Sequence, residues 1–193
     1  QKDLTVAVEL DLDFVAMSFV RDGEHIHLLR NTMKEQGYKA KIVAKIEDQE
    51  AVKHIDEIIL ASDAVMVARG DLGIEVHVEE LPIIQRQITR RCQELGRKVI
   101  VATHMLESMI ENPVPTRAEV TDVANAVFEQ ADAIMLSGET SVGTYPIKCV
   151  ETFDRIARRM EREPGAGYAE NAELTTDKQK TVNELKRLAK QAE

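Results

Sequence analysis

The chain has 193 residues and a formal net charge of −9, which makes a nucleic-acid backbone or an anionic membrane surface an unsuitable general partner. Its apolar fraction of 44% and charged fraction of 31% are ordinary for one globular domain with a sizeable core. No run of about 18 apolar residues occurs, so the sequence predicts no membrane span. The two cysteines, Cys92 and Cys149, have no metal-type spacing and predict a reducing, cytoplasmic setting.

Short apolar runs recur along the chain, each followed by a polar or glycine-containing turn and then by a helical pattern. The runs span residues 14–20, 40–46, 64–68, 98–102 and 133–136. Because they lack clean polar alternation, they are typical of strands buried on both faces. Five such strands that alternate with helices predict a parallel sheet with right-handed crossovers.

Cap residues mark the helices between these runs. Asp48 is placed to cap the helix that follows the second run, and Gly96 is placed to end the helix before the fourth run. Thr116 and Glu119 form a capping-box pattern. Pro146 suits the first position of the last helix of the series.

The chain is predicted to contain a partial barrel domain, residues 1–163, and a tail, residues 164–193. A complete (β/α)₈ barrel typically has about 250 residues, whereas five strands are predicted here. We therefore expect an α/β fold that is a partial (β/α)₈ TIM barrel, with five parallel βα units plus a C-terminal helix. Residues 164–167 read as a linker and residues 176–193 as a charged helix. Residues 2–9 predict a further helix without a cap, as expected for a chain that is cut inside a helix.

Polar residues follow the runs at the points where ligands bind in parallel β/α folds. The second run leads to Lys45 and Glu47, the third to residues 70–73, the fourth to residues 103–104 and the fifth to residues 137–140. This pattern predicts an ammonium group, two carboxylates, a hydroxyl group and flexible glycines around one rim.

Glu47 and Asp71 are predicted at adjacent strand ends, and carboxylate oxygens suit a hard divalent cation such as Mg²⁺ or Mn²⁺. A capping or salt-bridging role is the alternative for either residue alone. Lys45 lies two residues before Glu47, so both side chains point to the same side of the strand. Such a lysine can neutralise a phosphoryl group or a developing enolate, or it can pair structurally with one of the two carboxylates.

Gly70 and Gly73 bracket Asp71 in a predicted tight turn. Because glycine permits positive φ and close backbone approach, N–H groups here can hold a carboxylate, although a tight loop without a ligand has the same pattern. Thr103 can orient a proton or a water molecule near a reacting carbon, or it can simply close its strand. His104 is predicted to be a packed or surface side chain.

Several strings of the chain closely resemble segments of the pyruvate kinase family, in the family's order. They are 42–47 (IVAKIE), 66–75 (MVARGDLGIE), 102–110 (ATHMLESMI), 115–119 (PTRAE), 122–127 (DVANAV) and 135–140 (MLSGET). The likeness runs from about Asp3 to Val182. It implies strands four to eight of the family's barrel domain, and a reaction in which phosphoenolpyruvate transfers its phosphoryl group to ADP to give pyruvate and ATP.

The resemblance also implies roles for residues of this chain. Lys45 would meet the transferring phosphoryl group, and Glu47 and Asp71 would bind the catalytic Mg²⁺ or Mn²⁺. The family mostly has a small polar residue such as asparagine where this chain has Asp48, and glutamine or asparagine where it has His104. Neither departure affects a direct ligand.

The substrate would be held at the neighbouring strand ends in the same scheme. The backbone around Ala68, Gly70 and Asp71 would hold the substrate carboxylate, and Thr103 would lie near the carbon that is protonated. Parts of the family's enzyme are expected to be missing here: the first three barrel strands, the lid domain, the carboxyl-terminal domain and the K⁺ ligands. We expect K⁺ use and a homo-oligomer for the full-length parent, and no activity of the isolated chain.

Two other interpretations remain open from the sequence. One is a metal-dependent aldolase or lyase acting on pyruvate enolates, which also holds a divalent ion on glutamate and aspartate but usually lacks the arrangement of Lys45 and Glu47. The other is a non-catalytic half-barrel that self-associates through its open strand edges.

Overall fold

The computed structural model describes residues 2–168, and its architecture is α/β. Within that part of the chain, five strands form one sheet in the order β1-β2-β3-β4-β5. They are β1 (Phe14–Met17), β2 (Lys41–Ile46), β3 (Ala64–Ala68), β4 (Lys98–Ala102) and β5 (Ala133–Met135). Every adjacent pair is parallel. All the carboxyl ends of the strands therefore lie along the same edge of the sheet.

Helices connect the strands, as a parallel sheet requires. In chain order they are α1 (Lys2–Glu9), α2 (Gly23–Glu35), α3 (Gln49–Lys53), α4 (Ile55–Ala61), α5 (Arg69–Glu75), α6 (Leu81–Glu94), the 3₁₀ helix η1 (Glu107–Ile110), α7 (Arg117–Phe128), α8 (Gly138–Ser141) and α9 (Pro146–Met160). The predicted series of βα units is confirmed.

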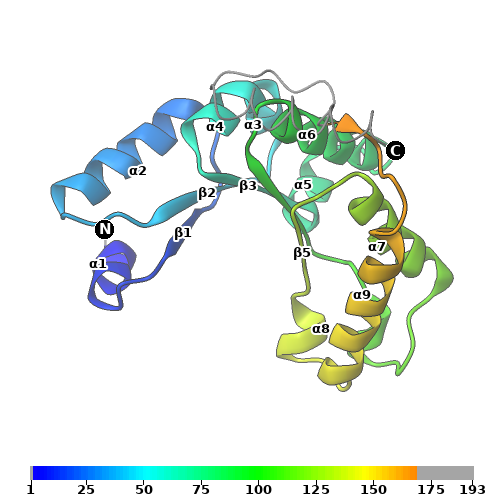
Figure 1. Cartoon of the computed structure of the whole chain (residues 1–193). Helices are drawn as coiled ribbons and strands as arrows, with labels where there is room; N and C mark the ends of the chain where they lie inside the picture. Colours follow the sequence, from blue (N-terminus) through cyan, green and yellow to red (C-terminus); the bar gives the residue numbers. More distant parts are fainter. Residues whose placement is uncertain (1, 169–193) are drawn as a thin grey trace, which may run out of the picture.

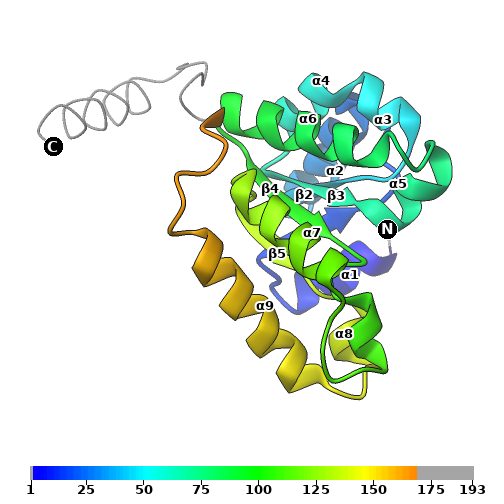
Figure 2. The same ribbon diagram turned by 90° about the vertical axis from the view of Figure 1, so that its right-hand side faces the viewer.

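The sheet is curved, and its helices lie on one side of it. Figure 1 shows the strands as an arch, with α2, α4 and α6 along the outer side. Figure 2 shows α7 and α9 packed side by side beyond β5. This arrangement is the expected partial barrel, with the helical layer outside and the strands inside.

Strand side chains that point outward form the main core. On β2 and β3 these are every second residue, among them Ile42, Ile46 and Val67, and all three are completely buried. The helical side chains of the same core include Ile26, Met33, Ile58, Ile59, Ile84 and Ile88. Each fully buried aliphatic side chain of this size contributes about 1.5–3 kcal/mol, so this layer fixes which face of each strand meets the helices.

The opposite face of the sheet is less buried, and the edge strands differ from the prediction. Both faces were expected to be buried, but β1 alternates between exposed and half-buried residues, and its Phe14 is 55% exposed. On β2, Val43 and Lys45 point to this inner face. Since β1 and β5 are the edge strands of the described sheet, each has only one neighbouring strand to cover it.

Most caps appear where the sequence predicts them. The Asp48 side chain accepts a hydrogen bond from the Ala51 N–H at 2.8 Å, and Gly96 follows α6 with a φ of 67°. Pro146 is the first residue of α9. Two boundaries were wrong: β1 ends at Met17 instead of residue 20, and the predicted helix after β2 is divided into α3 and α4 at His54.

Beyond α9 the chain turns back towards the end of α7. The Ala166 N–H donates to the Phe128 carbonyl at 2.8 Å. Gly165 has a φ of +71°, and a Cβ there would lie 3.0 Å from the Gln130 Cγ, so glycine is required for this close approach. The predicted charged helix at 176–193 lies outside the described residues, and the domain boundary at 163/164 stays a prediction. Among residues 2–168, no helix combines the length and the apolarity needed to cross a bilayer.

The start of α7 is stabilised by the predicted capping box, which can be tested directly. The Thr116 hydroxyl accepts from the Glu119 N–H at 3.2 Å, and the Glu119 carboxylate accepts from the Thr116 N–H at 2.7 Å. We expect Thr116→Ala to lower the free energy of unfolding by about 1 kcal/mol, measured by urea denaturation. Thr121→Ala, on the exposed face of the same helix, is the matched control and should change it by less than about 0.5 kcal/mol. Equal losses in the two variants would contradict the capping role.

Glu119 also makes stability depend on acid pH. Burial alone would raise the pKa of this carboxyl, but hydrogen bonds from Ser108 and Thr116 outweigh burial and hold the pKa below its ordinary value. The contribution is therefore present above the ordinary glutamate pKa of about 4.3 and is lost as the pH falls through that value and then through the lowered pKa. We expect unfolding free energy to fall more steeply between about pH 5 and about pH 3 in the wild type than in Glu119→Gln. Parallel curves would refute this assignment.

Candidate active site

The register of the sheet places the predicted site residues at one edge. Ile46 of β2 pairs with Val67 of β3, and Ala68 of β3 pairs with Ala102 of β4. Glu47 therefore leaves β2 beside Ala68, and Thr103 follows directly after Ala102. The polar residues predicted at three strand ends lie next to one another along this edge, where parallel β/α folds bind their ligands.

Lys45 and Glu47 form an ion pair on the inner side of β2. The Lys45 Nζ lies 2.5 Å from the Glu47 Oε1, and the Glu47 side chain is 1% exposed. The predicted common side of the strand is thus confirmed. The structural pairing weighed from the sequence is also present, so the Lys45 ammonium group is neutralised by Glu47 in this structure.

Two residues after β1 complete this pair, and the sequence reasoning missed both. The Phe19 N–H donates to the Glu47 Oε2 at 2.6 Å, and the Lys45 Nζ lies 3.1 Å from the Ser18 Oγ. Phe19 has a φ of 51°, a left-handed conformation that directs its N–H to the carboxylate side. The predicted strand runs through Val20 and therefore covers this turn, although Ser18 is a polar residue inside an otherwise apolar run.

The residues after β3 form a helix instead of the predicted glycine turn. α5 begins at Arg69, and Gly70 and Gly73 both lie within it without positive φ. Gly70 lies against the end of β4, where a Cβ at this position would make an ordinary van der Waals contact of 3.5 Å with the Thr103 Oγ1. Its N–H donates to that oxygen at 2.8 Å. The structure therefore joins the ends of β3 and β4 through Gly70 and Thr103.

Asp71 lies in the first turn of α5 and is exposed. Its carboxylate makes no hydrogen bond or ion pair with any other residue in the part of the chain that the structure describes. An acidic side chain in the first helical turn is favoured by the helix dipole. The carboxylate is thus available to an external ligand.

Thr103 and His104 form a strained turn at the end of β4. Their φ values are 70° and 53°, both in the left-handed region that side chains with a Cβ rarely adopt. The Thr103 hydroxyl donates to the Ala102 carbonyl at 2.6 Å while it accepts from the Gly70 N–H. His104 is exposed, which is the second of the two placements predicted for it, a packed or a surface side chain. Strain of about 1–3 kcal/mol per residue collects at functional sites when the surroundings impose it.

Arg69 is the second missed feature, and it lies directly behind this turn. It is a buried arginine, 7% exposed, and its guanidinium group donates to the Thr103 carbonyl at 2.6 Å and contacts Asp122 at 2.7 Å. Its remaining partners are the Ala102 carbonyl, the Gln85 Oε1 and the Met105 Sδ. A single basic residue between a strand and a helix carried no signal in the sequence that separated it from a surface arginine.

A buried acidic residue, Glu139, follows β5 and connects two loops by hydrogen bonds. Glu139 is completely buried, and its carboxylate accepts from the Leu106 N–H at 3.0 Å and the Ser137 N–H at 2.7 Å. Burial, and then the Glu139 charge, raise the pKa of the neighbouring Cys149 thiol to about 11. Both oxygens of Glu139 therefore accept backbone N–H groups and hold the residues after β4 and after β5 together.

The residues at this edge fit a divalent cation of the Mg²⁺ type. Glu47 and Asp71 offer carboxylate oxygens at neighbouring strand ends, and Mg²⁺ commonly uses one or two protein carboxylates while water and substrate oxygens complete its shell. Among residues 2–168, no group of three or more histidine, cysteine or acidic side chains could hold an ion alone. The donor set therefore suits an ion shared with a substrate, and it does not suit a closed structural site.

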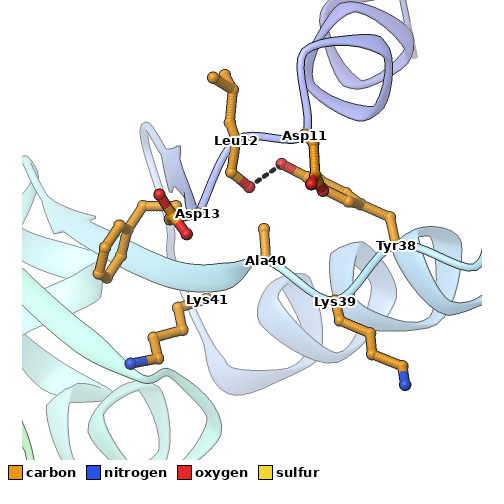
Figure 3. Close-up of a pocket in the computed structure, with 8 residues that line it drawn as sticks. Asp11, Leu12, Asp13, Tyr38, Lys39, Ala40 and Lys41 are labelled. Atoms are coloured by element: carbon orange, nitrogen blue, oxygen red, sulfur yellow. Dashed lines mark hydrogen bonds between the residues drawn. The ribbon is translucent and has the colours of Figure 1, made fainter.

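A separate pocket of about 290 Å³ lies at the opposite ends of β1 and β2 (Figure 3). In it the Tyr38 hydroxyl donates to the Leu12 carbonyl at 2.5 Å. Burial, followed by the charges of Asp11 and Asp13, raises the pKa of Tyr38. Because groups that act on ligands occupy the carboxyl ends of strands in such folds, the strand-end cluster is the candidate site.

Known proteins resemble this chain over most of its length. A model of the pyruvate kinase barrel domain matches residues 1–150. The pyruvate kinase of Corynebacterium efficiens is 52% identical over 84% of this chain and 34% of its own length. The pyruvate kinase of Clostridium perfringens is 50% identical over 87% of this chain and 36% of its own length. The chain spans about a third of the length of the curated relatives it matches.

The ion pair in the candidate site can be tested by a double-mutant cycle. Lys45→Met leaves the buried Glu47 carboxylate with the Phe19 N–H as its remaining described partner, so we expect a loss of about 2–3 kcal/mol in unfolding free energy. Adding Glu47→Gln should restore about 1–2 kcal/mol of this loss. Lys98→Met removes an exposed lysine that pairs with Asp132, and as a control it should cost less than about 1 kcal/mol. Additive effects of the two site substitutions in urea denaturation would show that the pair is not coupled.

Proposed function

Because the chain belongs to the pyruvate kinase family, we propose that it is the part of the catalytic barrel that supplies Lys45, Glu47 and Asp71 to phosphoryl transfer. The reaction is transfer from phosphoenolpyruvate to ADP, giving pyruvate and ATP. The observation that carries the proposal is the ion pair between Lys45 and the buried Glu47 at the end of β2, with the exposed Asp71 in the helix that follows the neighbouring strand β3. Family membership favours this reading over an aldolase or lyase.

Glu47 and Asp71 are the residues that would hold Mg²⁺ or Mn²⁺. When bound, such an ion neutralises the charge that develops on phosphoryl and enolate oxygens. The Glu47 carboxylate is held in place by two donors, the Lys45 ammonium group and the Phe19 N–H. The Asp71 carboxylate is exposed and so can be reached by an ion from solvent.

Lys45 would meet the transferring phosphoryl group. Its ammonium group is held on the inner face of the sheet by Glu47 and Ser18, with a quarter of the side chain exposed. A fixed positive charge in a partly dry site stabilises the charge of a phosphoryl group in flight more than a mobile lysine in water would. Removal of this charge is expected to affect turnover more than the binding of the cation.

The enolate side of the reaction would be handled at the ends of β3 and β4. The backbone around Ala68, Gly70 and Asp71, where α5 begins, would hold the substrate carboxylate. The Thr103 hydroxyl would lie near the carbon that is protonated. Its oxygen accepts from the Gly70 N–H and its proton is donated to the Ala102 carbonyl, and these two bonds hold the hydroxyl group in place.

The remaining proposals rest on the family alone. They are K⁺ as a second cation of the full-length parent, a homo-oligomeric assembly and a cytoplasmic location. The groups that would bind K⁺ are expected outside this chain, so these proposals concern the longer protein. The same holds for the proposed inactivity of the 193-residue chain when it is isolated.

The proposal is tested first by cation binding and then by turnover. Mn²⁺ binding, followed by electron paramagnetic resonance, should show one site in the wild type that weakens at least about tenfold in Glu47→Ala/Asp71→Ala. The matched control, Glu151→Ala/Asp154→Ala on the exposed face of α9, removes the same charge and should bind normally. Equal binding by both double variants would refute the assigned ligands.

A coupled assay of ATP formation from phosphoenolpyruvate and ADP, with Mg²⁺ and K⁺, completes the test. Turnover by the chain alone that disappears in Glu47→Ala/Asp71→Ala would establish the catalytic role and overturn the expected inactivity. Cation binding without turnover, in a chain shown to be folded by circular dichroism, is the expected result for a catalytic segment.

A further inference from the structure

Arg69 is the most heavily bonded side chain at the carboxyl edge of the sheet. Its guanidinium group reaches the carbonyl oxygens of Ala102 and Thr103, the two peptide groups that lead into the strained turn. The shortest of these bonds, from Nη2 to the Thr103 oxygen, is 2.6 Å. No other basic side chain among the described residues donates a hydrogen bond to this turn.

The turn needs an external support. Thr103 and His104 are consecutive residues in the left-handed conformation, and strain of this kind persists only when the surroundings over-determine the backbone. A planar guanidinium group with several fixed donors can bind two adjacent carbonyl oxygens at once, which a lysine ammonium group cannot do with the same geometry. The observed contacts match this use of arginine.

The charge of Arg69 is compensated on its other side. Asp122 of α7 lies 2.7 Å from the Nη1, and the Gln85 Oε1 of α6 accepts from the same nitrogen at 3.3 Å. Gln85 in turn donates to the buried Glu129 at 3.0 Å. Two helices thereby hold the guanidinium group in place, since a buried arginine without a counter-charge would be costly.

We propose that Arg69 is a positioning residue that fixes the Thr103 hydroxyl for proton transfer, with Asp122 as the partner that orients the guanidinium group. This inference rests on the proposed function of Thr103. Arg69 touches neither substrate nor cation in this scheme. It acts by holding the Thr103 carbonyl, so that the Thr103 Oγ1 stays at 2.8 Å from the Gly70 N–H.

The test compares Arg69→Lys, Arg69→Met and Asp122→Asn in the 193-residue chain. The first readout is the ratio of the hydrogen-exchange rate of the Gly70 amide to the exchange rates of the β2 amides. A general loss of stability speeds exchange at both places, so this ratio reports a local effect at Gly70. We expect this ratio to rise at least about tenfold in Arg69→Met and Arg69→Lys, and by a smaller factor in Asp122→Asn. The coupling constant that reports the φ of Thr103 should shift in the same variants.

A matched control is available on α6. Arg91 forms ion pairs with Asp56 and Glu94, away from the strand ends. Arg91→Met should leave the Gly70 ratio and the Thr103 coupling constant unchanged. If Arg69→Met does not fold, Arg69→Lys and Asp122→Asn decide the question, since they retain the size and polarity of the native side chains. An unchanged Gly70 ratio in both would overturn the proposal.

Failure of the positioning role can be told apart from failure of the proposed function. A wild-type chain that binds no Mn²⁺ and forms no ATP counts against the proposed function, while the exchange ratio still reports whether Arg69 holds Thr103. If the wild-type protein forms ATP, Arg69→Lys should lower kcat for this reaction at least about tenfold, while the KM for phosphoenolpyruvate stays within about twofold of the wild-type value. A change of about tenfold in KM with an unaltered kcat would contradict a role of Arg69 in positioning Thr103 for proton transfer.

Discussion

The parallel pairing of strands in chain order is the constraint on which the rest of the structure depends. Each crossover returns the chain to the same side of the sheet, so every strand ends at the same edge. The outer core then fixes the register, because a slip of one residue would turn Ile46 inward and Lys45 into the helical layer. Burial of aliphatic side chains on one face thereby determines where charged groups emerge on the other.

At that edge, the residues that follow one strand are hydrogen-bonded to the residues that follow a neighbouring strand. The Phe19 N–H after β1 bonds Glu47 after β2, and the Gly70 N–H after β3 bonds Thr103 after β4. Arg69 connects this second pair to α7 through Asp122. The site is thus a chain of contacts between neighbouring units, and no single unit contains it.

The sequence was sufficient for features that depend on periodicity and caps. The two-residue period of a strand placed Lys45 and Glu47 together, and the capping box at Thr116 needed no tertiary information. Prediction from the sequence failed where contacts between distant residues determine the local structure. Gly70 looked like a turn residue, but it lies inside α5, where its N–H bonds the Thr103 hydroxyl. Arg69 could not be distinguished from a surface arginine, since its partners lie 33 or more residues away along the chain, apart from Gln85.

The two consecutive left-handed residues at the end of β4 have a consequence for protein engineering and for evolution. Selection for thermal stability alone would favour glycine or asparagine there, because these residues adopt such φ values at lower cost. The same replacements would remove the hydroxyl group of Thr103 or loosen the turn that directs it. This short stretch is therefore a place where thermostability and catalytic competence would be selected in opposite directions.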